Sequence, residues 1–182
     1  TVAGDVVYYP DWGGNLHALD TVTGEKLWTF EENDSTHWLT APAISGGVAY
    51  HVEYDSTLHA IDTATGEEIW SFEADGILSR SPAVKDDHVV FTTIGGHLYA
   101  VDAGSGELLW DFNAGTATEG YAKPIIAGDV VYFAGGDRKL RALELATGAQ
   151  LWSYQTAGTL GTPLPYRGKV LFTSGNTLAL LR

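Results

Sequence analysis

The chain has 182 residues, a formal net charge of −13 at pH 7 and no cysteine. This acidic balance argues against a nucleic-acid partner, because phosphate binding needs a basic face. The lack of cysteine excludes disulfides, thiolate metal sites and a cysteine nucleophile. No apolar run reaches the ~18 residues that a membrane-spanning helix needs, and we interpret the initial Thr1 as a mature or trimmed start.

Short β-strands separated by turn residues are predicted along the whole chain. The second repeat shows the pattern most clearly, with predicted strands over Ala41–Ser45, Gly47–Tyr54, Thr57–Asp62 and Glu67–Glu73. We name these strands A to D, from innermost to outermost, and expect them to run antiparallel. Strand B recurs in every repeat, at Val6–Tyr9, Val48–Val52, Val89–Thr93, Val130–Phe133 and Val170–Thr173.

One 11-residue motif, A-x-D-x-x-T-G-x-x-x-W, occurs four times and ends at Trp28, Trp70, Trp110 and Trp152. Only Ser105 and Glu144 depart from it. A period of ~40 residues built from short strands indicates a β-propeller with one four-stranded blade per repeat. The sequence therefore predicts one all-β domain over 1–182, with blades over about 1–31, 37–74, 78–114 and 119–156 and a partial blade over 159–182.

The motif has a mechanical interpretation. Asp62 can accept backbone N–H bonds in the C–D turn, and Gly66 can adopt a positive φ there. Trp70 and Phe72 share one face of strand D and Ile69 lies on the other, so we expect cover on both faces. We assign the structural docking role to Asp20, Gly24, Trp28, Asp62, Gly66, Trp70, Asp102, Gly106, Trp110, Glu144, Gly148 and Trp152.

The first and last repeats differ from the others. Thr1–Tyr9 aligns with Pro124–Phe133, and Asn176–Arg182 aligns with Ser56–Asp62, so the fifth repeat stops at strand C. Three arrangements are compatible with this count: a closed five-bladed ring, part of a larger ring, or two paired chains. We favour the last two and expect further contacts, with a second copy or the rest of a larger propeller, at Val6–Phe30 and Pro163–Leu181.

The repeated motif resembles the tryptophan-docking motif of pyrroloquinoline-quinone-type (PQQ-like) propeller repeats, over essentially the whole chain. That family includes quinoprotein alcohol dehydrogenases, the lipoprotein scaffold of the outer-membrane barrel-assembly machinery and bacterial sensor domains. The resemblance to the dehydrogenases implies a quinone held under adjacent cysteines and a calcium ion held by Glu, Asn and Asp. This chain has no cysteine, and we match no residues to the calcium ligands, so no cofactor is predicted.

The residues outside the repeat frame are the candidates for function. Trp12 lies in the first B–C turn and Trp38 in the long D–A connection of Glu32–Ala41. B–C and D–A loops emerge on one face of a propeller, and aromatics with scattered charges are typical of binding surfaces. The competing interpretation is that both tryptophans pack against their own loops. The candidate binding surface comprises Asp11, Trp12, His37, Trp38, Glu53, Tyr54, Asp55, Arg80, Tyr121, Lys123, Asp137 and Arg138.

The histidines give only a weak metal signal. His17 and His59 occupy equivalent positions, where Tyr99 and Arg141 stand in later repeats, which indicates a solvated or seam position. His51 and Glu53 share a strand face, but two ligands are too few for a site, so no metal is predicted.

We interpret the chain as a non-catalytic protein- or ligand-binding scaffold propeller, located outside the cytoplasm by its family resemblance. Two alternatives remain open. One is a PQQ-dependent alcohol or sugar dehydrogenase, or a fragment of one, with calcium as second cofactor. The other is the extracytoplasmic sensor domain of a signalling protein.

Overall fold

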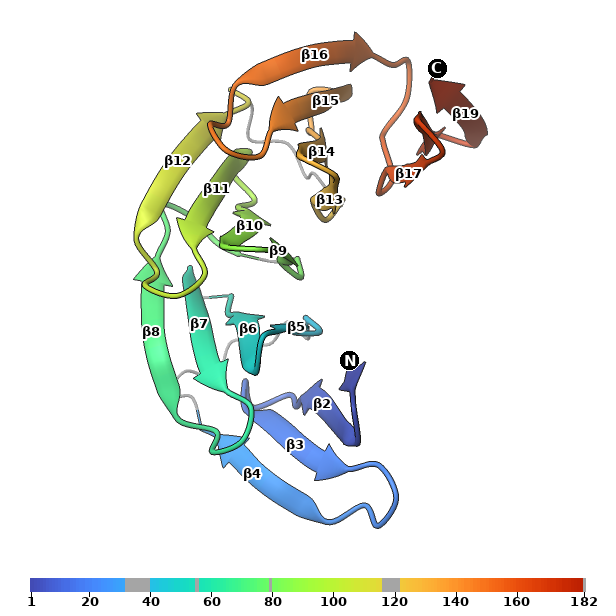
Figure 1. The fold of residues 1–182 in the computed structure, drawn as a ribbon. Coiled ribbons are helices and arrows are strands. Elements are labelled where there is room, and N and C mark those ends of the chain that lie inside the picture. The colour runs from blue at the N-terminus through green and yellow to red at the C-terminus, as the bar shows by residue number, and fades with distance from the viewer. Residues whose placement is uncertain (32–39, 55, 79, 116–121, 182) are drawn as a thin grey trace.

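The structure is a computed structural model that describes residues 1–31, 40–54, 56–78, 80–115 and 122–181. Within these residues all regular structure is β, in four four-stranded antiparallel sheets and one three-stranded sheet. The sheets follow one another along an arc, each with its first strand on the inner side and its last on the outer side (Figure 1). The predicted propeller fold is confirmed.

The strands of each sheet are consecutive in the chain. The first sheet holds β1 (Val2–Ala3), β2 (Val6–Pro10), β3 (Leu16–Asp20) and β4 (Lys26–Phe30). The second holds β5 (Ala43–Ser45), β6 (Val48–Val52), β7 (Thr57–Asp62) and β8 (Glu68–Glu73). The third holds β9 (Ala83–Lys85), β10 (His88–Thr92), β11 (His97–Asp102) and β12 (Leu108–Asn113). The fourth and fifth hold β13 (Ile125–Ala127), β14 (Val130–Ala134), β15 (Lys139–Glu144), β16 (Gln150–Gln155), β17 (Leu164–Tyr166), β18 (Lys169–Ser174) and β19 (Thr177–Leu181).

The alanine of the repeated motif faces the tryptophan across the sheet. Ala60 pairs with Trp70, and the register then shifts between Ala60 and Ile61. The same pairing and shift occur in the other three complete sheets. The alanine leaves room for the indole of its cross-strand partner. The adjacent bulge re-orients strand D, so that the tryptophan side chain points toward the next sheet.

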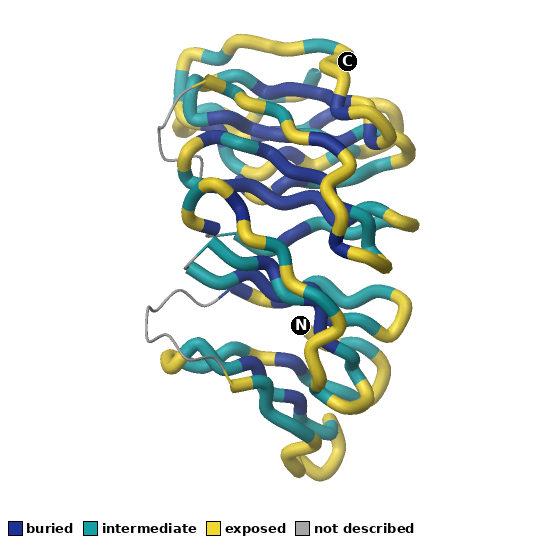
Figure 2. The backbone as a smooth tube through the Cα atoms, turned by 90° about the vertical axis from the view of Figure 1, so that its left-hand side faces the viewer, coloured by how far each residue is buried: buried dark blue, intermediate teal, exposed yellow. Residues whose placement is uncertain are grey.

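The core consists of four clusters, one between each pair of neighbouring sheets. Figure 2 shows the buried residues concentrated along the middle of the strands, with the turns exposed. Strand D is covered on one face only, which corrects our expectation of cover on both. Its second face carries residues that are about half exposed, because it lies at the outer rim: Leu27, Ile69, Leu109 and Leu151.

The described sheets do not close into a ring. Contacts between sheets run along the inner strands, from β5 to β9, from β9 to β13 and from β13 to β17. The N-terminus lies in the sheet at one end of the arc and the C-terminus in the sheet at the other (Figure 1). The closed five-bladed arrangement considered from the sequence is therefore wrong.

Candidate binding face

The loops that carry the candidate residues gather at one end of the sheets. The amide of Ile94, in a B–C turn, donates to the carbonyl of Ile77 in the preceding D–A connection at 2.8 Å. In the fifth sheet Gly175 donates in the same way to Thr159 at 2.8 Å. Each of these D–A connections therefore rests on the B–C turn of the following sheet, and together they form one loop face.

In the first sheet a polar turn holds Trp12 out toward solvent. Asp11 Oδ1 accepts from the amides of Gly13, at 2.7 Å, and Asn15, at 3.1 Å. Its other carboxylate oxygen lies 2.7 Å from His17 Nε2. These bonds, that to His17 first, lower the pKa of Asp11 to about 2, so the carboxylate stays charged and the turn stays ordered. Trp12, at its tip, is 68% exposed, unlike a residue packed on its own loop.

In the second sheet a half-buried acid–imidazole group joins Glu53, in the equivalent turn, to His59 on β7 and to the exposed Glu68 on β8. His59 Nδ1 lies 2.5 Å from Glu68 Oε2, and its Nε2 lies 3.5 Å from Glu53 Oε2. Burial lowers the pKa of His59, but the two carboxylates outweigh it and raise the pKa overall. His51, its cross-strand partner, is buried. That burial, and the charge of His59, lower the pKa of His51 to about 4.

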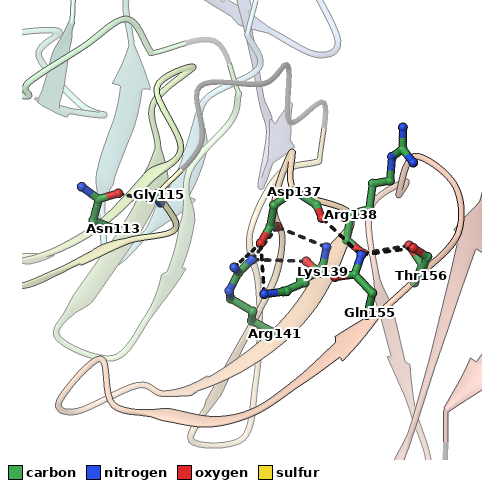
Figure 3. Close-up of polar contacts among 8 residues, drawn as sticks. All are labelled: Asn113, Gly115, Asp137, Arg138, Lys139, Arg141, Gln155 and Thr156. Atoms are coloured by element: carbon green, nitrogen blue, oxygen red, sulfur yellow. Dashed lines mark hydrogen bonds and ion pairs between the residues drawn. The ribbon is translucent and has the colours of Figure 1, made fainter.

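In the fourth sheet the B–C turn presents Arg138 (Figure 3). Asp137 binds the Arg141 guanidinium through both oxygens, at 2.9 and 2.5 Å. Burial raises the pKa of Asp137, but Arg141 holds it below its usual value. Arg138 has a φ of 62°, and its carbonyl accepts from the amide and hydroxyl of Thr156, both at 2.9 Å. These bonds hold the backbone while its side chain stays exposed.

The remaining candidate residues vary in exposure. Tyr54 and Arg80 are half-buried and both make interactions, whereas Lys123 is exposed. The structure brings Asp11 together with His17, Glu53 with His59, and Asp137 with Arg141, each pair within one blade. Four candidate residues lie outside the described residues: His37, Trp38, Asp55 and Tyr121.

Sequence reasoning missed these acid–base pairs. The turn carboxylates Asp11 and Glu53 each stand six positions before the partner histidine, at 17 and 59. That equal spacing is the available signal, and the histidine positions are those that the sequence predicts to be solvated or seam-facing. The structure places His59 in the seam, with the ring of Phe30 from the first sheet 5.3 Å away.

The tryptophans of three blades dock on the following blade. Trp28 Nε1 donates to the carbonyl of Thr63 at 2.9 Å, Trp70 to that of Ala103 at 3.1 Å, and Trp110 to that of Leu145 at 2.7 Å. Each acceptor directly follows the motif Asp or Glu. The indoles lie flat on the motif glycines, since a Cβ at Gly66, Gly106 or Gly148 would lie 2.7 Å from the ring.

The docking turns are built by the motif acids. Asp62 Oδ1 accepts from the amides of Ala64, at 2.9 Å, and Thr65, at 2.8 Å, while Gly66 has a φ of 77°. Asp20 and Asp102 form the same bonds in their turns. In the fourth blade Glu144 instead accepts from the Thr147 hydroxyl at 2.5 Å. The turn thus presents its glycine and a free carbonyl to an incoming indole.

No group of three or more His, Asp or Glu side chains suited to a metal ion occurs in the described part of the chain. Glu53, considered from the sequence as a ligand with His51, faces His59 instead. No helix suited to crossing a membrane is found among the described residues.

The fold and the docked tryptophans define a β-propeller of PQQ-like repeats. A family profile described as "Outer membrane protein assembly factor BamB" matches residues 1–180, and the chain belongs to this family. No curated protein matches the sequence.

Solved structures share this fold. BamB from Moraxella catarrhalis is 22% identical, with a TM-score of 0.86 over 98% of this chain and 58% of its own. The computationally designed Ika8 protein is 17% identical, with a TM-score of 0.87 over 100% of this chain and 56% of its own. The quinohemoprotein alcohol dehydrogenase of Comamonas testosteroni is 18% identical, with a TM-score of 0.72 over 97% of this chain and 39% of its own. The chain thus spans little more than half the length of the first two.

Proposed function

We propose that this chain is a non-catalytic scaffold that binds a protein partner on its loop face, as part of outer membrane protein assembly outside the cytoplasm. The family match over residues 1–180 supports the class of function. The observation that carries the binding surface is Trp12, 68% exposed on a turn fixed by Asp11. An exposed aromatic on a rigid support is a typical anchor for a protein interface, because little side-chain entropy is lost on binding.

The loop face also offers opposite charges at separate places. Asp11 lies beside Trp12 in the first blade, whereas Lys123 and Arg138 are exposed around the fourth. Ala122 packs in the same cluster as Ala134 and Leu140, and these two residues flank the Arg138 turn. An acidic and a basic region on one face would orient a partner whose charges are arranged in the opposite sense.

Site-specific photo-crosslinking tests this proposal. A crosslinking residue is placed at Trp12 or Arg138 and, as the control, at Val22, which is 86% exposed on a C–D turn at the opposite end of the sheets. The chain is expressed in the envelope of a Gram-negative host. We expect positions 12 and 138 to capture the same outer-membrane assembly protein and position 22 to capture none of it. Equal capture at all three positions, or capture at 22 alone, would contradict the proposal.

The proposal also predicts no quinone-dependent oxidation of alcohols or sugars. The chain has no cysteine to form the ring over a quinone, and we match none of its residues to the calcium ligands that the resemblance implies. With PQQ and calcium added, dye reduction in the presence of ethanol or glucose should equal that of a heat-denatured sample. Dye reduction that depends on both quinone and native protein would favour the dehydrogenase alternative.

A further inference from the structure

The turn that carries Trp12 is held from two blades. Within the first blade, Asp11 bonds to two amides of the turn and lies 2.7 Å from His17 Nε2. From the second blade, His51 on β6 makes a hydrogen bond with the backbone of Gly14, two residues after Trp12. That bond raises the pKa of His51, as expected when the imidazole donates its proton to the Gly14 carbonyl. The exposed indole of Trp12 therefore stands on a contact between two blades.

His51 lies where a positive charge is hard to place. Its side chain is 2% exposed, and its cross-strand partner is a second histidine, His59. Glu68 lies 2.5 Å from one ring nitrogen of His59, and Glu53 lies 3.5 Å from the other. Both carboxylates favour the charged form of His59. The ring of Phe30, from the first blade, covers His59 at 5.3 Å.

A second proton on this pair of histidines would place two positive charges side by side in the seam. The Cα atoms of an antiparallel cross-strand pair are only ~4.5–5.5 Å apart, and an unpaired buried charge is costly. Burial and the charge of His59 therefore lower the pKa of His51 to about 4. His51 is neutral at neutral pH and gains its proton in acid. The protonated ring is accommodated by leaving the seam for water, and Gly14 then loses its donor.

The other ionisable groups at the turn do not loosen it in acid. The pKa of Asp11 is lowered to about 2, so this carboxylate keeps its charge. A proton on His17 would strengthen its bond to Asp11, because opposite charges would then meet at 2.7 Å. Glu53 and Glu68 contact His59 and favour its proton, which adds to the cost of a second one. His51 is therefore the group whose protonation weakens the support of the turn.

The later blades lack this pair. Phe91 and Phe133 stand at the position of His51 in the third and fourth blades. In the fourth blade the position of His59 holds Arg141, which Asp137 binds through both oxygens. A guanidinium keeps its charge throughout the acidic range, and phenylalanine does not titrate. The turn of Arg138 is thus built without an imidazole, on the same loop face as Trp12.

We propose that His51 and His59 form an acid-sensitive support of the Trp12 turn, which releases the turn and a protein partner held at Trp12 when the medium becomes acidic. The turn of the fourth blade keeps its arrangement under the same conditions. The release of a partner rests on the proposed function, whereas the loosening of the turn does not and is measured on the chain alone.

Fluorine NMR of the whole chain labelled with 5-fluorotryptophan tests the loosening. The Trp12 resonance is assigned by its loss in Trp12→Phe, and the resonance of Trp110, 8% exposed in another seam, reports on the rest of the fold. Between about pH 7 and pH 4 we expect the Trp12 line to narrow at least twofold, while the Trp110 line keeps its position and width.

Two matched variants assign the effect to one imidazole. His51→Gln can still donate to Gly14 but does not titrate, so the Trp12 line should keep its width down to about pH 4. His17→Gln can still donate to Asp11 and should retain the narrowing. A Trp12 line that does not narrow in the wild type, narrowing that persists in His51→Gln, or a simultaneous change of the Trp110 line would overturn the proposal.

Photo-crosslinking in an envelope extract then separates this inference from the proposed function. We expect the ratio of capture at position 12 to capture at position 138 to fall at least threefold from about pH 7 to pH 4. In the His51→Gln chain the ratio should stay constant. A constant ratio in the wild type would overturn the release of the partner and leave the proposed function intact. A lack of capture at position 12 already at pH 7 would instead contradict the proposed function.

Discussion

The seam between the third and fourth blades and the seam between the fourth and fifth differ although both begin with the same strand-D motif. Trp110 is 8% exposed and bonds to Leu145 across the seam at 2.7 Å. Trp152 is half-buried, its indole N–H has no acceptor among the described residues, and a cavity of about 280 Å³ opens beside it. The tryptophan alone does not complete a seam. Within residues 1–182 the fifth blade offers Trp152 no C–D turn, so comparing the two seams separates the contribution of the turn from that of the tryptophan.

The largest expected effect of this difference is on stability. Trp110→Ala should lower the free energy of unfolding by about 3–5 kcal/mol, because it removes a buried aromatic and leaves a cavity. Trp152→Ala should cost only about 1–2 kcal/mol, because its ring already lies beside an open cavity. Urea unfolding of both variants measures the two losses. Equal losses would show that the docking turn adds nothing to the seam.

A second effect appears on acidification and involves the seam between the first two blades. His51 has a pKa of about 4 in the folded state against 6.5 when unfolded. The unfolded state therefore binds more protons in this window, and stability should fall by on the order of 3 kcal/mol as pH drops through it. His51→Gln should flatten the decrease. A wild-type curve that is already flat between these pH values would contradict the assignment.

His59 should act in the opposite direction. Its folded pKa is raised by Glu53 and Glu68 against the effect of burial. Its contribution to stability is therefore present below the unfolded pKa and is lost as pH rises through the folded pKa. In the same titration, His59→Gln should remove a stability loss on the alkaline side, and it should also reduce the fall on the acid side, because the charge of His59 contributes to the low pKa of His51.

A smaller effect on stability distinguishes the docking turn at Gly148, which carries the indole of Trp110, from the turn at Gly24, where a Cβ would meet nothing within 4 Å. Gly148→Ala and Gly24→Ala share the cost of a left-handed backbone, about 1–2 kcal/mol, since their φ values are 71° and 70°. Only the first adds a Cβ 2.7 Å from Trp110, which should cost about 1–3 kcal/mol more. Thermal unfolding of the two variants gives the difference. No difference would mean that the indole moves aside without cost.

The sequence was sufficient for the fold because the repeat contains its own turn chemistry. Asp62 and Gly66 mark the C–D turn, and the tryptophan spacing sets the blade period. The direction of docking was not predictable, since the acceptor is a backbone carbonyl that any residue provides, as Thr63, Ala103 and Leu145 show. The exposure of Ile69 was also not predicted. An apolar residue in a strand is expected to be buried, and the sequence does not indicate that this face of strand D lies at the outer rim.

The candidate binding face was predictable only in part. Trp12 stood out because it falls outside the repeat frame, and the structure shows it exposed. The pairing of Glu53 with His59 did not stand out, because it depends on which strand face points into the seam. His59 shares its strand face with Ile61, which is buried in the cluster between the first two sheets, and this orientation depends on packing between blades rather than on a local motif.

Hydrogen exchange of the indole N–H groups tests the docking account most directly. Trp28, Trp70 and Trp110 donate to carbonyls of the following blade, so their indole protons should exchange slowly. Those of Trp12, exposed on its turn, and of Trp152, without an acceptor among the described residues, should exchange fast. Protected resonances for Trp28, Trp70 and Trp110, each lost in the variant of its own tryptophan, are the expected result. Protection of Trp152 equal to that of Trp110 would contradict the claim that the docking turn completes each seam.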